Sequence, residues 1–211
     1  MGDSPIAFIR ETIREFRTTG SLAPSSLFLA RALANGLPSD VPPNFKVLEV
    51  GPGTGSVTVE VIRRMNGNGS LDMYEINPAF CKFLRGRISK EEIFKSLGGR
   101  LKLHEGDVLD LKPQPHYNAI VCGLPFTNFK PAEVQHFFEH FRTILHPKGS
   151  LLWYEYVAIN KIRAPFLSKE RREQLKDIKV VIGRFIRAHQ VNQEIVTINL
   201  PPARVRHLKF G

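Results

Sequence analysis

The chain has 211 residues, of which 42% are hydrophobic and 24% charged, proportions typical of a globular protein that can bury a core of its own. It contains no run of about 18 apolar residues, which excludes a transmembrane helix, and its two cysteines are too few for a disulfide framework. The net charge of +10 is unevenly spread, since residues 161–211 hold 12 Lys and Arg against 4 Asp and Glu, and this asymmetry predicts a polyanionic partner, either nucleic acid or an anionic membrane surface.

Residues 1–36 predict two amphipathic helices that form a unit of their own, with residues 37–211 as the main domain. In the first helix, apolar residues recur at spacings of three and four on one face, and arginines recur on another. The apolar residues are Ile6, Ile9, Ile13 and Phe16, and the arginines are Arg10, Arg14 and Arg17. The second helix is expected at residues 27–34, and a linker with three prolines follows at residues 36–44.

From residue 46 onward, predicted strands and helices alternate. Strands are expected at residues 46–50, 71–76, 101–104, 118–122 and 151–155, followed by strand-like segments at residues 194–200 and 204–210. Helices are expected from the glycine turn to Met65, from Pro78 to Ile88 with a charged continuation to Ser96, before Pro147 and Gly149, and from Lys169. This alternation predicts an α/β fold with a right-handed, doubly wound parallel sheet, extended at one edge by an antiparallel hairpin.

The turn after the first of these strands is a candidate cofactor loop. Residues 47–55 read V-L-E-V-G-P-G-T-G, an apolar strand followed by glycines that let a ligand approach the backbone and the first amides of a helix. Glu75 ends the next strand 20 residues after Gly55, where a carboxylate can accept both ribose hydroxyls of an adenosine cofactor. Gly106 and Asp107 end the third strand, where a side chain can pair with an adenine amino group.

The glycine spacing distinguishes two kinds of cofactor. Dinucleotide-binding folds use G-x-G-x-x-G, whereas this chain has G-x-G-x-G with an acid two residues before the first glycine, and so it resembles the class I S-adenosylmethionine-dependent methyltransferases. The resemblance implies a Rossmann-like sheet of seven strands, S-adenosylmethionine as cofactor and S-adenosylhomocysteine as product. It places the glycines at the methionine end of the cofactor, Glu75 at the ribose and Asp107 at the adenine. The implied cofactor-binding residues are Ser26, Glu49, Gly51, Gly53, Gly55, Glu75, Ile76, Asp107, Val108, Gly123 and Leu124.

The residues after the fourth strand indicate the substrate class. Adenine-N6 methyltransferases carry Asn-Pro-Pro-Tyr or Asn-Leu-Pro-Tyr here, but residues 123–126 read Gly-Leu-Pro-Phe and lack the amide. This version resembles the soluble bacterial phosphatidylethanolamine N-methyltransferases, as do G-S-L-A-P-S-S at residues 20–26 and N-L-P-P-A-R-V at residues 199–205. The resemblance implies methylation of phosphatidylethanolamine or its methylated derivatives, towards phosphatidylcholine. Glu155 departs from the family, which usually has a Thr before its Tyr.

Physical chemistry supports an amine acceptor independently of the family. Methyl transfer from a sulfonium is an in-line displacement that needs a free nitrogen lone pair. Glu155 and Tyr156, at the end of the fifth strand, are candidates to attract the ammonium and help to remove its proton. Phe126, Tyr154 and Tyr156 are candidates to surround the nitrogen by cation–π contact, worth about 0.5–2 kcal/mol each. Packing in the core is the alternative role for either tyrosine.

Partners and location follow from a lipid substrate. The first helix is expected to place its apolar face in the headgroup layer and its arginines against anionic lipid, or else to cover the cofactor pocket. The helix from Lys169 offers a second lipid-contacting surface through Arg171, Arg172, Lys176 and Lys179. We therefore expect a monomer that binds phospholipid headgroups and no metal, in the cytoplasm and peripheral on the inner face of the cell membrane.

Two further motifs are expected to be structural. His136, Glu139 and His140 spell H-x-x-E-H, the zinc signature of one peptidase group, but no third ligand accompanies them and they are expected on the polar surface of a helix. Cys122 is expected to be a small, buried apolar residue.

Two other functions are kept as alternatives. The first is an rRNA adenine N6-methyltransferase that binds nucleic acid through the basic tail, which the missing Asn opposes. The second is a membrane-binding protein that has lost catalysis, which cofactor binding without turnover would identify.

Overall fold

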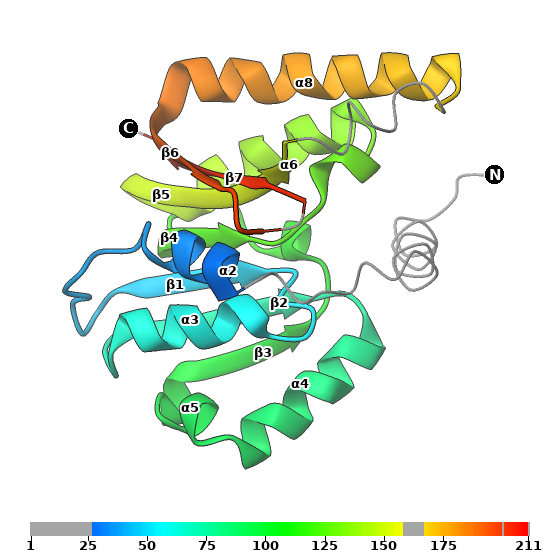
Figure 1. Ribbon diagram of the computed structural model, residues 1–211. Helices are drawn as coiled ribbons and strands as arrows, with labels where there is room; N and C mark the ends of the chain where they lie inside the picture. The colour runs from blue at the N-terminus through cyan, green and yellow to red at the C-terminus, as the bar shows by residue number, and fades with distance from the viewer. Residues whose placement is uncertain (1–26, 158–166, 200, 211) are drawn as a thin grey trace.

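The computed structural model describes residues 27–157, 167–199 and 201–210. Within them the chain forms one seven-stranded sheet in the order β3-β2-β1-β4-β5-β7-β6, as Figure 1 shows. β1 to β5 run parallel, and β7 lies antiparallel between β5 and β6. The strands are β1 (Lys46–Val50), β2 (Ser70–Glu75), β3 (Leu101–Glu105), β4 (Tyr117–Cys122), β5 (Leu145–Tyr156), β6 (Gln190–Val196) and β7 (Ala203–Lys209). The predicted doubly wound sheet and its antiparallel hairpin are confirmed.

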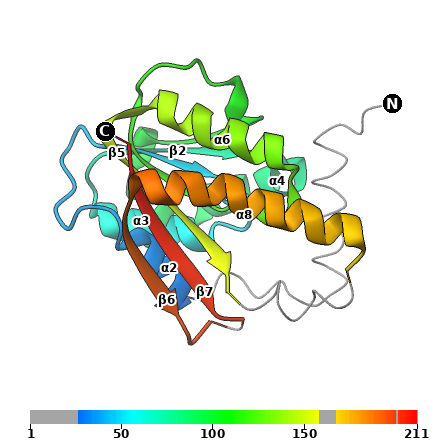
Figure 2. The ribbon, with the colours of Figure 1, turned by 90° about the horizontal axis from the view of Figure 1, so that it is seen from above.

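Helices cover both faces of this sheet (Figure 1, Figure 2). α2 and α3 lie on one face, and α6 and α8 lie side by side on the other. The helices are α2 (Leu27–Ala34), α3 (Ser56–Met65), α4 (Pro78–Lys90), α5 (Glu92–Lys95), α6 (Pro131–Ile144) and α8 (Lys169–His189), with 3-10 turns η1 (Gly98–Arg100), η2 (Val108–Asp110) and η3 (Phe126–Asn128). In the described part of the chain, no helix is both long and apolar enough to cross a membrane.

The sheet separates two hydrophobic cores, because neighbouring residues of a strand point to opposite faces. In β4, Ala119 and Val121 join the core under α2 and α3, whereas Ile120 and Cys122 join the core under α6 and α8. Burial raises the pKa of the Cys122 thiol to about 12, which agrees with its expected role as an apolar residue. Parallel strands that are buried on both faces have continuous apolar sequences, and this is why the sequence of β4 predicts a strand.

The helix that follows β2 is interrupted, where the sequence predicts a continuation to Ser96. Glu91 takes an extended conformation (φ −90°, ψ 126°) and divides α4 from α5. The Glu91 carboxylate accepts hydrogen bonds from Arg87, and the Arg87 guanidinium also lies 4.8 Å from the ring centroid of Phe94. The break lets Phe94 enter the core, where it is 1% exposed, and the burial of this ring explains the changed direction of the chain.

Two other boundaries differ from the prediction. α6 ends at Ile144, and Pro147 and Gly149 lie in an irregular first part of β5, where the register with β4 shifts. β6 begins at Gln190, directly after α8 and earlier than the predicted residue 194. Pairing with β7 explains this earlier start, because Gln190 lies opposite Leu208, a fully buried residue.

Candidate active site

The carboxyl ends of the parallel strands meet at one edge of the sheet, where doubly wound folds bind their ligands. Strand register places Val50 beside both Tyr74 and Cys122, so the residues that follow β1, β2 and β4 come together. Two backbone hydrogen bonds continue past the strand ends: the Gly51 N–H donates to the Tyr74 carbonyl over 2.9 Å, and the Gly123 N–H donates to the Val50 carbonyl over 2.8 Å. The candidate cofactor residues from distant parts of the sequence therefore lie along one edge.

The glycine loop exposes its backbone at one point. Gly51 and Gly53 have φ angles of 68° and 57°, in the left-handed region that favours glycine. In the described part of the chain, a Cβ added to Gly53 would meet no atom within 4 Å, so these residues leave this part of the loop open to a ligand. Gly55 is the N-cap of α3, where a Cβ would lie 2.9 Å from the Leu84 side chain in α4. The loop thus combines ligand access with close packing of two helices.

Gly123 is the point of closest approach between two strand ends. A Cβ at this position would lie 2.6 Å from the carbonyl oxygen of Gly51, a separation that real Cβ atoms essentially never show. The side chain of Leu124 lies 3.2 Å from where a Cβ on Gly51 would be, so Leu124 closes the same side of the loop. The backbone itself therefore requires glycine at residue 123, the position at which adenine-N6 methyltransferases carry Asn.

Glu75 is held rigidly against the glycine loop. Its Oε2 accepts a hydrogen bond from the Gly53 N–H over 3.1 Å, and its Oε1 accepts one from the Asn77 N–H over 2.8 Å. Burial raises the pKa of this carboxyl, and the hydrogen bonds from Asn77, Gly53 and Ile76 oppose the rise. Each carboxylate oxygen can accept a second hydrogen bond, so the group retains capacity for the ribose hydroxyls of an adenosine.

The side chain of Glu49, near the end of β1, is a buried carboxyl group at the same edge. The residue is 1% exposed, and among the described residues its Oε2 has no hydrogen-bond partner. Burial raises the pKa of the carboxyl to about 8, the Thr58 hydroxyl on α3 opposes the rise, and the charge of Glu75 adds to it. A buried polar atom without a partner is costly, so this oxygen fits a donor from a ligand, such as the ammonium of a bound methionine moiety.

Asp107 stands at the end of β3. Its Oδ1 accepts a hydrogen bond from the Leu109 N–H over 3.0 Å and so caps η2, which leaves the other oxygen for a ligand such as an adenine amino group. Val108, the next residue, is buried. Ile76 follows Glu75 directly and is half-buried.

His140 is buried, where the sequence predicts a polar helix surface. It is 8% exposed, and its Nε2 lies 3.0 Å from the carbonyl oxygen of Val108. Burial lowers the pKa of this imidazole. His140 thus joins α6 to the turn that carries the candidate adenine contact, whereas His136 and Glu139 are exposed as expected. The signal for burial was the spacing of three from Phe137, which places His140 near the apolar face of the helix.

The residues of the H-x-x-E-H motif, which the sequence predicts to be structural, lie in different surroundings, since His140 is buried and His136 and Glu139 are exposed. Glu139 accepts a hydrogen bond from the Gln135 side chain over 2.8 Å. In residues 27–157, 167–199 and 201–210, no group of three or more His, Cys, Asp and Glu side chains could hold a metal ion.

Tyr154 and Tyr156 form an aromatic pair at the end of β5. They point to the same face of the strand, their ring centroids are 5.5 Å apart, and the rings are nearly perpendicular, at 79°. Both are half-buried against the core under α2 and α3. Burial raises the pKa of the Tyr156 phenol, and a hydrogen bond with Tyr154 opposes the rise. Two phenol rings therefore lie together at the carboxyl end of β5, which β4 separates from β1 and its glycine loop.

Glu155 points to the other face of β5, so it does not share a site with Tyr156. It accepts hydrogen bonds from Arg206 Nε over 2.9 Å and Arg206 Nη2 over 2.6 Å, and Arg204 Nη1 lies 3.6 Å away. Alternation along the strand is the physical reason, because adjacent residues face opposite sides. The predicted pairing of Glu155 with Tyr156 around one ammonium is replaced by a cluster that joins β5 to β7.

Phe126 is a core residue in this structure. It is 5% exposed, and its ring centroid lies 5.0 Å from that of Phe138 and 6.2 Å from that of Phe137, both in α6. The ring packs in the core under α6 and α8, whereas the tyrosine pair packs against the core on the other face of the sheet. The expected aromatic cage of three rings is therefore reduced to two.

Several predicted residues lie outside the described residues. They are Ser26 of the cofactor set and Ile9, Arg10, Ile13, Arg14, Phe16 and Arg17 of the expected membrane helix.

In sequence, the chain is similar to known methyltransferases. Residues 47–149 match the family model described as a methyltransferase domain. An ornithine lipid N-methyltransferase from Singulisphaera acidiphila is 29% identical over 151 residues, which cover 68% of this chain and 73% of that protein. A mitochondrial ribosomal RNA small subunit methyltransferase from Arabidopsis thaliana is 28% identical over 93 residues, which cover 44% of this chain and 22% of that protein.

Solved structures show the same fold. A crystal structure of an S-adenosylmethionine-dependent methyltransferase from Methanosarcina mazei superimposes with a TM-score of 0.63 at 14% sequence identity, over 84% of this chain and 96% of that chain.

Proposed function

We propose that the chain, of which residues 47–149 match a methyltransferase domain, transfers a methyl group from S-adenosylmethionine to the amino group of a membrane lipid and releases S-adenosylhomocysteine. The observation that carries this proposal is the likeness to a lipid N-methyltransferase over 68% of the chain. Among amine lipids we propose phosphatidylethanolamine and its methylated derivatives as acceptors, towards phosphatidylcholine.

The residues of the carboxyl edge fit the cofactor. Bound S-adenosylmethionine supplies a methyl group on a sulfonium, which nitrogen attacks in line. We propose that Glu75 accepts hydrogen bonds from the ribose hydroxyls. Oε2 of Glu49, which has no partner among the described residues, is proposed to accept from the methionine ammonium. The second oxygen of Asp107 remains for the adenine amino group. Because these groups are already held by backbone hydrogen bonds or by burial, little reorganisation is needed on binding.

The tyrosine pair is the proposed acceptor-binding element. A phenol whose pKa is raised keeps its proton at neutral pH, so Tyr156 Oη acts as a hydrogen-bonding group and not as a base. The two rings can hold a methylated ammonium by cation–π contact, worth about 0.5–2 kcal/mol each. Glu155 is occupied by Arg206, so we assign the departing ammonium proton to solvent.

We place the reaction at the cytoplasmic face of the cell membrane, with the enzyme as a monomer. Support comes from α8, where Lys169, Arg172, Lys176 and Lys179 are exposed and can approach anionic lipid. Arg171 does not belong to this group, because it donates to the carbonyl of Thr127 over 2.8 Å and fastens α8 to η3. The N-terminal apolar and arginine residues are proposed to add a second contact.

A ribosomal RNA adenine methyltransferase is the second candidate, favoured by the Arabidopsis relative. Its target nitrogen is held in related enzymes by an Asn at the position of Gly123. The 2.6 Å approach of a Cβ to Gly51 leaves no room for that Asn in this backbone, which is why we prefer the lipid.

The test is a methyl-transfer assay with labelled S-adenosylmethionine and three acceptors in separate tubes. These are vesicles with phosphatidylethanolamine, vesicles with ornithine lipid and structured RNA. Glu75→Ala is expected to lose about tenfold or more of the cofactor affinity, because hydrogen bonds to a charged group contribute about 1.5–3 kcal/mol. Glu105→Ala is the matched control, since Glu105 lies opposite Glu75 in β3 but is exposed and pairs with Arg85.

Each result has a defined meaning. Label in phosphatidylethanolamine that depends on Glu75 and not on Glu105 supports the full proposal. Label in ornithine lipid alone supports lipid N-methylation and overturns the choice of phosphatidylethanolamine. Label in RNA alone overturns the proposal in favour of the second candidate.

A further inference from the structure

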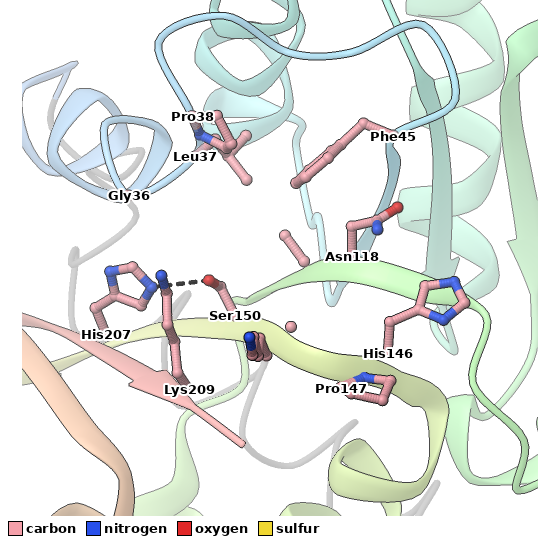
Figure 3. Close-up of a pocket in the computed structure, with 13 residues that line it drawn as sticks. Gly36, Leu37, Pro38, Phe45, Asn118, His146, Pro147, Ser150, His207 and Lys209 are labelled. Atoms are coloured by element: carbon pink, nitrogen blue, oxygen red, sulfur yellow. Dashed lines mark hydrogen bonds between the residues drawn. The ribbon is translucent and has the colours of Figure 1, made fainter. Parts of the chain in front are cut away.

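A hollow of about 280 Å³ lies at the amino edge of the sheet, opposite the edge that carries the glycine loop. Figure 3 shows it between the loop after α2 and the strands β5 and β7. Leu37, Pro38 and Phe45 form its apolar wall. Its polar lining consists of Asn118, His146, Lys148, Ser150, His207 and Lys209. The volume is just below the range of about 300–1,000 Å³ typical of drug-sized ligands, so it suits a smaller one.

The charge of this hollow is one-sided. Among the described residues, its lining contains two lysines and two histidines but no Asp or Glu. Within the described part of the chain, the side chains of Lys148 and Lys209 have no hydrogen-bond or ion-pair partner. His207 and Lys209 lie two residues apart on β7 and so share one face of the strand. Burial, together with the charge of Lys209, lowers the pKa of His207, so the lysines carry the positive charge. Positive charge that is concentrated in a concave site without counter-charge attracts anions.

A neutral side chain of the lining adds a further hydrogen-bond donor. The Asn118 side-chain oxygen accepts a hydrogen bond from the Lys46 N–H over 2.8 Å, so its amide NH₂ is the part that remains for a ligand. His207 Nε2 and Ser150 Oγ lie 2.8 Å apart, and Lys209 stands beside this pair in Figure 3. Two ammonium groups and an amide NH₂ around one hollow match an ion that has several acceptor oxygens.

The backbone at the rim adds an independent observation. Lys148 has a φ angle of 64°, in the left-handed region that residues with a side chain rarely adopt. Its N–H donates to the Phe210 carbonyl over 2.8 Å, and this bond ties the rim to the end of the chain after β7. Strained residues that the surrounding structure holds in place cluster at binding sites. Here the strain fixes the position of a lysine at the mouth of the hollow.

We propose that this hollow binds the phosphate group of a small anion, such as inorganic phosphate or a phosphomonoester. The ligand would contact β5 and β7 on one side and the loop after α2 on the other, and so would stabilise the folded protein. This site is separate from the methyl-transfer edge, and its occupancy does not depend on the proposed function.

The test uses the full chain without cofactor. Inorganic phosphate and glycerol 3-phosphate are titrated by calorimetry at constant ionic strength, with chloride as the competing anion. Lys148→Gln/Lys209→Gln is compared with Lys102→Gln/Lys112→Gln, which removes the same charge from exposed positions outside the hollow. A parallel sedimentation assay with vesicles containing phosphatidic acid tests whether a lipid headgroup is the source of the phosphate. All variants are checked for folding by their unfolding transitions.

We expect saturable binding of a soluble phosphate by the wild type, at least tenfold weaker binding by Lys148→Gln/Lys209→Gln, and a change within twofold for the control. Sedimentation with phosphatidic acid that depends on the same two lysines, without binding of soluble phosphate, would support the site and assign it to a lipid headgroup. An absence of both kinds of binding in the wild type, or equal losses in the two double variants, would overturn the proposal. Neither readout involves methyl transfer, so its failure is distinguishable from failure of the proposed function.

Discussion

Two buried carboxylates beside the glycine loop differ in how their oxygens are satisfied. Glu75 accepts two backbone hydrogen bonds, whereas Oε2 of Glu49 has no partner among the described residues. The Glu75 carboxylate is therefore held in one position, whereas Oε2 of Glu49 can accept a hydrogen bond from a cationic ligand. The difference follows from their positions, since Glu75 ends a strand next to free backbone N–H groups and Glu49 lies within one.

Glu49 gives the protein an unusual dependence of stability on pH. Its pKa is raised from 4.5 to about 8, so the folded protein retains a proton at pH values where the unfolded chain has lost it. The free energy of unfolding should therefore fall as the pH rises between about 5 and 8, by at most about 1.4 kcal/mol per pH unit from this group. Urea unfolding of the wild type and Glu49→Gln across this range measures the contribution. A variant that shows the same slope as the wild type would contradict the assignment.

The second prediction concerns the addition of a single Cβ atom at Gly123. Gly123→Ala adds a Cβ that meets the Gly51 carbonyl at 2.6 Å, whereas Gly106→Ala adds one that meets nothing within 4 Å. Overpacking of this kind costs about 1–3 kcal/mol, so Gly123→Ala should lower the free energy of unfolding by that amount and also weaken cofactor binding. Chemical denaturation and calorimetry measure the two effects, and Gly106→Ala should stay near the wild type. Full stability of Gly123→Ala would show that the strand ends can separate at little cost.

The sequence predicts best those helices and strands whose hydrophobic pattern lies within the element itself. The strand and helix at residues 46–50 and 27–34 appear with the predicted bounds, because buried strands and short amphipathic helices carry their signal locally. Alternation along a strand separates the faces of neighbouring residues, but tertiary packing decides which partner a residue near a strand end will meet. Glu155 turns towards Arg206, and Phe126 turns under α6, for reasons that lie in distant segments. The arrangement of the candidate cofactor residues along one edge was therefore predictable, whereas the surroundings of Glu155 and Phe126 were not.

The Glu155 cluster joins three strands and can be tested as such. Arg206 is 8% exposed and donates to Glu155 on β5 and to Gln190 on β6, from its own place on β7. Glu155→Gln should lower the free energy of unfolding by about 1–3 kcal/mol, because it leaves a charged donor poorly paired. Glu194→Gln, at an exposed position of β6, is the control.

The same variant separates a structural role from a catalytic one. If Glu155 has only the structural role of binding Arg206, the pH profile of kcat for folded Glu155→Gln should be the same as for the wild type. Loss of the acidic limb of that profile, where a proton acceptor becomes protonated and inactive, together with unchanged stability, would instead identify Glu155 as the proton acceptor.

In the whole molecule, the candidate cofactor residues and the positively charged surfaces lie in different places. The cofactor residues lie at the carboxyl edge, the positively charged hollow lies at the amino edge, and α8 covers one face with exposed lysines and arginines. A basic helix is more often a solvated surface than a binding site, so its role in lipid contact needs a direct comparison.

Removal of four charges from α8 provides that comparison. Lys169, Arg172, Lys176 and Lys179 are exposed, and basic residues near an anionic membrane contribute about 1 kcal/mol each at low salt. Replacement of all four by Gln should weaken binding to vesicles with anionic lipid at least tenfold, and the loss should shrink as salt rises because screening shortens the range of the attraction. The control replaces Lys82, Lys90, Lys102 and Lys112, exposed residues around α4, β3 and the turn after η2, and so removes equal charge elsewhere. Cofactor affinity should stay unchanged in both variants. Equal losses of vesicle binding would mean that net charge, and not the place of α8, attracts the protein to the membrane.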